Sequence, residues 1–359
     1  MDYIPYDYKK AEKIAERTRA FYDAPAGRAL IHIKSCDSLD IPPMPPLNSF
    51  SFPDDTERYL DMRAEREYAF LRFHEGIDDD YIPSVSPWYG IAEHTAFLGG
   101  KVDFTPDTTF QHQICENIED CEKLTLDPEN MWIKLVVGGI KYLREKWGEY
   151  IPVKMRGADG PSDIANAVRG TDIFYDIYDE PEALSRLMDF CAEAANFTLD
   201  LQRAEATEIA GGRITGFGLW MPGKCMGQLS EDFSTMVSPD VYEEFFLPAL
   251  EKCVADCDMA MLHTHSLGQK LLPLFAKIDK IRLIELSSDP NSDRAVTVFR
   301  KYHEELKDKN VIVAPTYEEL CGMGDLLESS KTIIWYYAKD ENDAKRSLEA
   351  VEKYRFVSR

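Results

Sequence analysis

Short runs of apolar and β-branched residues alternate with long helical patterns along the whole chain. This alternation constrains the fold most, because strands that are each followed by a helix pair as a parallel sheet with helices outside it. We predict eight strands, at 29–33, 81–86, 151–155, 214–219, 259–263, 283–287, 311–314 and 332–337, with the clearest helices at 182–206, 239–256 and 340–354. Eight such units predict an α/β fold, the (β/α)8 TIM barrel. A doubly wound sheet is the alternative, but no strand leads into the Gly-x-Gly-x-x-Gly loop of its dinucleotide-binding form.

The chain shows neither an internal repeat nor a Gly/Ser-rich linker. Residues 1–359 are therefore predicted to form one barrel domain. We expect two additions to the barrel. Residues 1–27 form an N-terminal helix, and residues 40–55 form a loop because their five prolines exclude helix and ladder pairing. That loop is either a surface connector or a lid over a site.

The charge balance narrows the classes of partner. Lys and Arg number 41 against 64 Asp and Glu, which gives a net charge of −23. Such a surface repels phosphate backbones and anionic lipid, so we expect no nucleic acid and no membrane partner, but a small-molecule substrate. The first residues lack the apolar core of a signal peptide, and no run of 18 apolar residues occurs. With eight scattered cysteines and no Cys-x-x-Cys motif, we expect a cytoplasmic protein.

Two histidines mark the end of the fifth predicted strand. In a barrel, catalytic groups gather at the carboxyl ends of the strands, and residues two apart on a strand share a face. His263 and His265 would therefore point together into the mouth, with Glu285 one strand away. These three residues form a candidate His2Glu zinc site with an open position. The alternatives are two catalytic or hydrogen-bonding histidines without metal, and a Glu285 carboxylate paired with Arg282.

Other strand ends carry candidate substrate-binding groups. Arg156 could hold a substrate carboxylate with Asp159 beside it, or the two could brace their loop as an ion pair. Tyr89 after the second strand and Tyr337 in the eighth offer flat apolar walls with a polar tip. Asp232, next to Glu231, either binds a ligand, caps a helix or is solvated.

Three segments carry a family resemblance. They are the stretch from Gly160-Pro161 through Arg169-Gly170 to Asp179-Glu180-Pro181-Glu182, the block Leu229-Ser230-Glu231-Asp232 with Ser238-Pro239, and His263-Thr264-His265. In order and spacing the chain resembles the uroporphyrinogen decarboxylase superfamily from about residue 80 to its end. The resemblance implies a (β/α)8 barrel, and its members are often homodimers.

The superfamily divides into two branches, and the chain is closer to one of them. True uroporphyrinogen decarboxylases carry an N-terminal Arg-Gln-x-Gly-Arg segment, where this chain reads Lys34-Ser35-Cys36-Asp37. The other branch holds zinc-dependent methyltransferases that act with a corrinoid (cobalamin) protein, and bind zinc through His-x-Cys and a Cys in strand eight. Here His265 replaces the first Cys, and Tyr336 and Tyr337 stand near the second.

We therefore expect a metal-dependent methyltransferase that acts with a corrinoid protein on a small methyl donor or acceptor. His263 and His265 would be its catalytic residues. Two alternatives remain, a decarboxylase or lyase acting on a smaller carboxylate, and a barrel that binds a ligand or a corrinoid protein without turnover.

Overall fold

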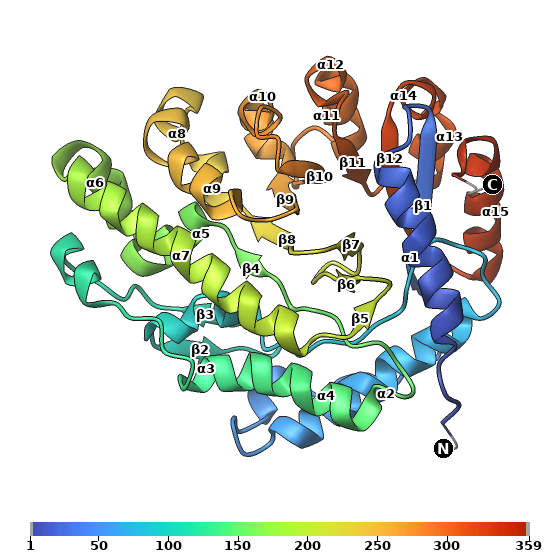
Figure 1. The fold of residues 1–359 in the computed structure, drawn as a ribbon, viewed down its shortest axis with the longest axis horizontal. Helices are drawn as coiled ribbons and strands as arrows, with labels where there is room; N and C mark the ends of the chain where they lie inside the picture. The colour runs from blue at the N-terminus through green and yellow to red at the C-terminus, as the bar shows by residue number, and fades with distance from the viewer. Residues whose placement is uncertain (1–2, 357–359) are drawn as a thin grey trace.

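A seven-stranded parallel sheet forms the centre of the molecule. The computed structural model describes residues 3–356. The sheet runs in the order β1-β12-β11-β10-β9-β8-β4 (Figure 1). Its strands are β1 (Arg28–Cys36), β4 (Ala158–Asp159), β8 (Cys225–Ser230), β9 (Met259–His265), β10 (Ile281–Ser287), β11 (Asn310–Val313) and β12 (Lys331–Ala338). A parallel sheet of consecutive strands is the barrel-like α/β architecture that the alternating pattern predicts.

Helices surround this sheet on the outside (Figure 1). They are α1 (Tyr8–Tyr22), α2 (Thr56–His74), α3 (Met131–Ile133), α4 (Gly139–Trp147), α5 (Pro161–Arg169), α6 (Ile173–Asp179), α7 (Pro181–Glu205), α8 (Pro239–Phe245), α9 (Leu247–Val254), α10 (Leu272–Phe275), α11 (Ala295–Lys301), α12 (His303–Leu306), α13 (Tyr317–Cys321), α14 (Gly324–Ser329) and α15 (Glu341–Val351). The helix predicted at 182–206 is α7. The helix predicted at 239–256 is instead divided at Phe246, because Pro248 opens a new helix there.

The second and third predicted strands are not regular strands. Segments 81–86 and 151–155 meet through a single parallel bridge between Val85 and Val153. Pro83 and Pro152 lack the N–H groups that a ladder needs.

Carboxylates supply the missing partners of β1 at this edge. The backbone N–H of Ile31 donates to Asp80 over 2.9 Å, and that of Ile33 donates to Asp79 over 2.7 Å. Side-chain carboxylates thus accept two N–H groups of β1 along this edge of the sheet.

The fourth predicted strand was also misplaced. Residues 214–219 fold back on themselves, with Gly218 at φ +77°. They belong partly to a small antiparallel sheet of β5 (Glu208–Ile209), β6 (Gly212–Ile214) and β7 (Trp220–Pro222). The strand of the parallel sheet is β8, a few residues further on. A second antiparallel pair joins β2 (Val102–Phe104) to β3 (Thr109–Gln111).

The proline-rich segment 40–55 is a connector. Leu47 and Phe50 are buried, and the rings of Phe50 and Phe52 pack edge-on against Tyr59 of α2 at 5.0 and 5.3 Å between centroids. None of these residues lines the two cavities described below, so the packing against α2 favours the connector interpretation.

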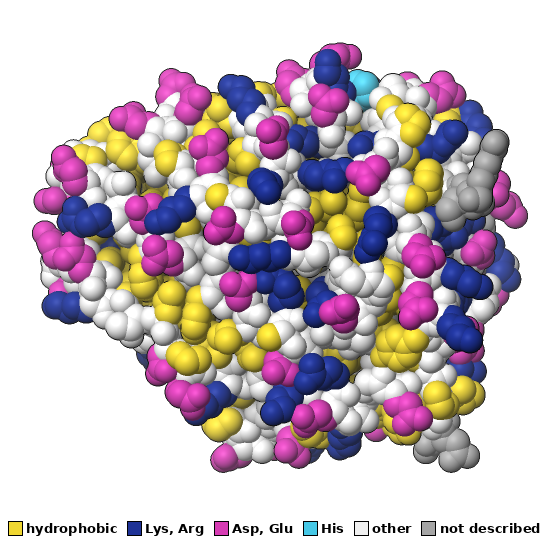
Figure 2. Space-filling model, viewed as in Figure 1, with side chains coloured by type: hydrophobic (Ala, Val, Ile, Leu, Met, Phe, Trp, Pro, Cys, Tyr) yellow, Lys and Arg dark blue, Asp and Glu magenta, His cyan; other side chains and the backbone are white. Residues whose placement is uncertain are grey.

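One connected cluster of buried hydrophobic residues extends from Ala11 in α1 to Tyr354 near the end of the described chain. Over the face seen in Figure 2, basic and acidic side chains are interspersed, with hydrophobic ones between them. Among residues 3–356, no helix has the length and apolar character needed to cross a bilayer. All eight cysteines are free, and seven of them are buried.

Candidate metal centre and substrate cavities

Three ligand-type side chains meet at the ends of β8 and β9. The Nε2 atoms of His263 and His265 lie 3.1 Å apart. An Oδ1 atom of Asp232, just beyond β8, lies 3.5 Å from the first and 3.4 Å from the second. In a tetrahedral zinc site with bonds of about 2.0–2.1 Å, neighbouring ligand atoms are about 3.3 Å apart. The spacing of the three atoms therefore fits one face of such a site.

Each imidazole is held from behind by a carboxylate. His263 Nδ1 contacts Glu285, and His265 Nδ1 lies 2.7 Å from Asp289 Oδ1. A carboxylate accepts a hydrogen bond from Nδ1–H, which leaves the lone pair of a neutral imidazole on Nε2. Two lone pairs and the Asp232 carboxylate then point at one another, an arrangement that a cation or a shared proton would stabilise.

The geometry corrects the predicted ligand set. Glu285 lies opposite His263 in the register of β9 and β10, so it reaches Nδ1 rather than the side that faces His265. Arg282 does not pair with it and instead contacts Asp23 over 2.9 Å. The carboxylate that joins the two histidines is Asp232, which we had expected among the substrate-binding residues.

Burial and neighbouring charges shift the pKa values of His263 and Asp289. Burial alone would lower the pKa of His263, but the Glu285 carboxylate accepts its hydrogen bond and stabilises the protonated ring, so the pKa is raised above its usual value. Asp289 shows the opposite balance. Partial burial would raise the pKa of Asp289, but the Leu267 N–H and His265 hold it below its usual value.

Further carboxyl groups lie beside Asp232. Burial, followed by the charge of Asp232, raises the pKa of Asp159 to about 7. Burial also raises the pKa of Glu231 to about 7, against hydrogen bonds from Ser162 and Tyr242. Asp163 accepts the N–H groups of Asp232 and Phe233 at 2.9 and 2.6 Å, which fixes the loop after β8. A cation at the histidines would thus lie next to groups that can take up or release a proton near neutral pH.

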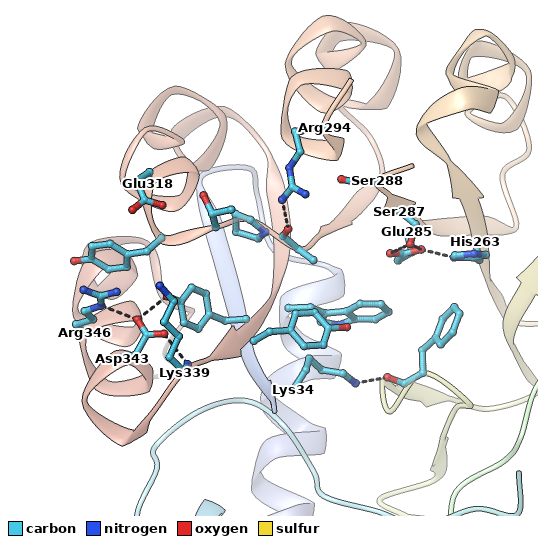
Figure 3. A pocket seen from close by; sticks show the side chains of 18 of the residues that line it. Lys34, His263, Glu285, Ser287, Ser288, Arg294, Glu318, Lys339, Asp343 and Arg346 are labelled. Carbon is cyan, nitrogen blue, oxygen red and sulfur yellow. Dashed lines mark hydrogen bonds and ion pairs between the residues drawn. The ribbon is translucent and has the colours of Figure 1, made fainter. Parts of the chain in front are cut away.

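Two cavities open beside the histidines, and both are lined by Gly216, Phe217 and His263. The first, of about 720 Å³, contains Lys34 and Lys154, and we call it the lysine cavity (Figure 3). The second, of about 950 Å³, contains Asp159, Asp163 and Asp232, and we call it the acidic cavity. His263 therefore stands where the two cavities meet.

Of the other predicted site residues, three line a cavity and one is buried. Asp159 lines the acidic cavity, and Tyr337, 56% exposed, lines the lysine cavity. Arg156 lines the acidic cavity too, but it is ion-paired with buried Glu93 rather than with Asp159. Tyr89 is wholly buried and donates its hydroxyl to the carbonyl of Leu135 over 3.2 Å. The prediction that Tyr89 binds substrate was wrong, because its ring packs beneath the rim.

Sequence reasoning missed three residues of this region. Asp289 follows β10 by two positions, so the rule that strand ends carry functional groups would have found it. Lys34 and Lys154 sit at or near strand ends too, but lysines at such places are common and gave no separate signal.

Comparison with known proteins adds one finding about the fold. No protein-family model and no curated protein matches this chain. Among solved structures, a methyltransferase from Methanosarcina mazei superposes with a TM-score of 0.63 at 13% sequence identity, over 95% of this chain and 99% of that one. At this identity the likeness shows a shared fold across nearly the whole chain.

Proposed function

We propose that this protein is a metal-dependent methyltransferase of the uroporphyrinogen decarboxylase superfamily, with zinc held by His263, His265 and Asp232. The observation that carries the proposal is the convergence of two imidazole lone pairs and one carboxylate oxygen at tetrahedral spacing. Three protein ligands leave a fourth position open, which is typical of catalytic rather than structural zinc. The shared fold with a methyltransferase supports the same assignment.

The ligand set indicates what the site can activate. When bound, zinc lowers the pKa of a thiol or hydroxyl group that coordinates it. Nitrogen and oxygen ligands make the site harder than the thiolate-rich one of the resembling branch. Glu285 and Asp289 hold the two imidazoles in the tautomer that presents Nε2. Asp159 in the acidic cavity is placed to accept the proton that a methyl acceptor releases.

The second component would be a corrinoid protein that carries the methyl group. The rim of the acidic cavity exposes Ile91, Phe110 and Met236, each more than half exposed. Apolar side chains around a polar cavity favour the docking of another protein over that mouth.

The lyase alternative is less well supported. It requires Arg156 to hold a substrate carboxylate, but Glu93 already neutralises that guanidinium. A protonated His263 would still be available as a proton donor, so the metal content of the protein decides between the two readings.

Elemental analysis of the purified protein after zinc reconstitution tests the proposal. We expect about one zinc per chain in the wild type, and its loss in His263→Ala, His265→Ala and Asp232→Ala. His112→Ala is the control. It removes an exposed histidine that pairs with Asp103 and is not a candidate ligand, so this variant should keep the metal. Zinc-loaded protein should then accelerate the transfer of the methyl group of methylcobalamin to a simple thiol. A wild type without zinc would overturn the proposal.

A further inference from the structure

Two half-buried lysines of the lysine cavity lack an anionic partner among the residues that the structure describes. Lys34, in β1, donates to the Phe217 carbonyl over 2.6 Å, and its Nζ lies 4.5 Å from the ring centroid of Tyr81 and 4.9 Å from that of Trp335. Among residues 3–356, no carboxylate oxygen lies within ion-pair distance of Lys34 or Lys154. Both lie on the cavity lining, so a ligand can reach them.

The two arginines of the same cavity are already neutralised. Arg294 is paired with Glu319 over 3.0 Å, and Arg346 is paired with Asp343 over 2.6 Å. Figure 3 shows Arg346 and Asp343 at the side of the cavity opposite His263, with Lys34 below. Lys339 also lines the cavity, and it lies beside Asp343, whose carboxylate accepts its backbone N–H over 2.9 Å. Lys34 and Lys154 are therefore the cations of the lining that lie away from this group of paired charges, in a chain whose net charge is −23.

The charges around Lys34 do not remove this excess. Burial, and then the nearby Lys154 ammonium, lower the pKa of Lys34 to about 7, while the more distant Glu67, Asp79 and Glu285 oppose the shift. Burial likewise lowers the pKa of Lys154 to about 8. The free protein thus holds two amino groups in a place that disfavours their charged form, and a bound anion would favour that form.

We propose that Lys34 and Lys154 form a subsite for a carboxylate group of the substrate. The inference rests on the proposed function, because it assigns the end of the substrate that is not methylated. The two lysine ammonium groups are point-charge donors, so they suit a single carboxylate. A substrate with several negative charges would be repelled at long range by the acidic chain. Phe217, Trp335 and Tyr337 give the same cavity aromatic walls, and these suit a flat or apolar body next to the carboxylate.

The position of His263 connects this subsite to the metal site. His263 lines both cavities, so a ligand anchored at the lysines extends past Phe217 toward the open face of His263. Phe217 packs edge-on against the His263 ring at 5.1 Å between centroids. A substrate that bridges the two sites would have its carboxylate in the lysine cavity and its methylated atom at the histidines.

Calorimetric titration with three ligands of the same shape tests the subsite. The ligands are benzoate, benzamide and benzylamine, which are anionic, neutral and cationic at pH 6.5. We expect benzoate to bind at least about tenfold more tightly than the other two, because only it forms charge-assisted hydrogen bonds with the lysines. Lys34→Met and Lys154→Met should each weaken benzoate binding about tenfold or more. Lys9→Met, in the exposed first turn of α1, is the control and should leave it unchanged.

The outcomes separate this inference from the proposed function. Equal binding of benzoate and benzamide to the wild type, or unchanged benzoate binding in both lysine variants, would overturn the subsite even if the protein holds zinc. Selective benzoate binding by a protein without zinc would support the subsite while overturning the metal mechanism. If one lysine variant fails to fold, the other variant and the comparison of ligands in the wild type still give the answer.

Discussion

The ammonium group of Lys34 lies in the lysine cavity, and from this position we predict an effect on stability. A half-buried lysine without a carboxylate partner costs folding free energy, because the unfolded chain solvates the charge more fully. We expect Lys34→Met, which keeps the length of the side chain but removes the charge, to raise Tm at pH 7 by roughly 2–6 °C. Thermal unfolding followed by circular dichroism measures the shift.

The pH dependence of that gain follows from the lowered pKa of Lys34, about 7 in the folded protein. Below pH 7 both the folded and the unfolded chains carry the proton, so the full cost is present. Between pH 7 and the ordinary lysine value the unfolded chain binds more protons, so the stability of the wild type rises with pH. The advantage of Lys34→Met should therefore shrink from pH 7 to pH 9. A variant less stable than wild type at both pH values would show that the contacts with Phe217, Tyr81 and Trp335 outweigh the cost of burial.

At the scale of elements, β1 depends on side chains at the edge that faces away from β12. Asp79 accepts the Ile33 N–H and also contacts His74 Nδ1 over 3.1 Å. Asp79→Ala would leave a buried N–H without a partner, so we expect a loss of about 1–3 kcal/mol in the free energy of unfolding. Chemical denaturation measures this loss.

Asp78→Ala is the matched control, because the Asp78 side chain is 87% exposed. This substitution should change the free energy of unfolding by less than about 0.5 kcal/mol. Equal effects of the two substitutions would mean that this edge of β1 does not depend on the carboxylate.

The same elements show where sequence reasoning succeeds and fails. The strands β9, β10, β11 and β12 and the helix α7 were predicted well, because buried parallel strands are continuous apolar runs and α7 has a long helical period. β8 was missed because its residues, Cys-Met-Gly-Gln-Leu-Ser, include Gly227 and Gln228, which weaken the strand signal. The run at 214–219 looked more β-like, but Gly216 and Gly218 turn it back on itself.

The candidate site could be predicted from the sequence only in part. Strand periodicity placed His263 and His265 side by side, and their nearness is confirmed. Spacing along the chain could not tell which carboxylate would face which nitrogen. That choice depends on the register between strands, which sets Glu285 against His263, and on the loop after β8, which brings Asp232 to the histidines.

At the scale of the whole molecule, residues far apart in sequence share one core and one site. The hydrophobic cluster continues from α1 to the last described turn. The candidate ligands come from the neighbouring ends of β8 and β9, while Lys34 comes from β1 and Lys154 from the segment that leads into β4. The lysine cavity and the candidate ligands therefore come together only when β1, β8 and β9 are all in place.

This continuity predicts that the chain unfolds as one cooperative unit. Urea unfolding followed by tryptophan fluorescence and by far-ultraviolet circular dichroism should give coincident transitions, since Trp88, Trp132, Trp147, Trp220 and Trp335 are spread over the whole sequence. A cation that binds only the folded state should shift the entire curve, by about 2.7 kcal/mol at a hundredfold excess of zinc over its Kd. The double variant His263→Ala, His265→Ala should keep the single transition and lose the shift. Two separated transitions in the wild type would show that the chain contains independently stable parts, and zinc would then stabilise only the part that includes β8, β9 and β10.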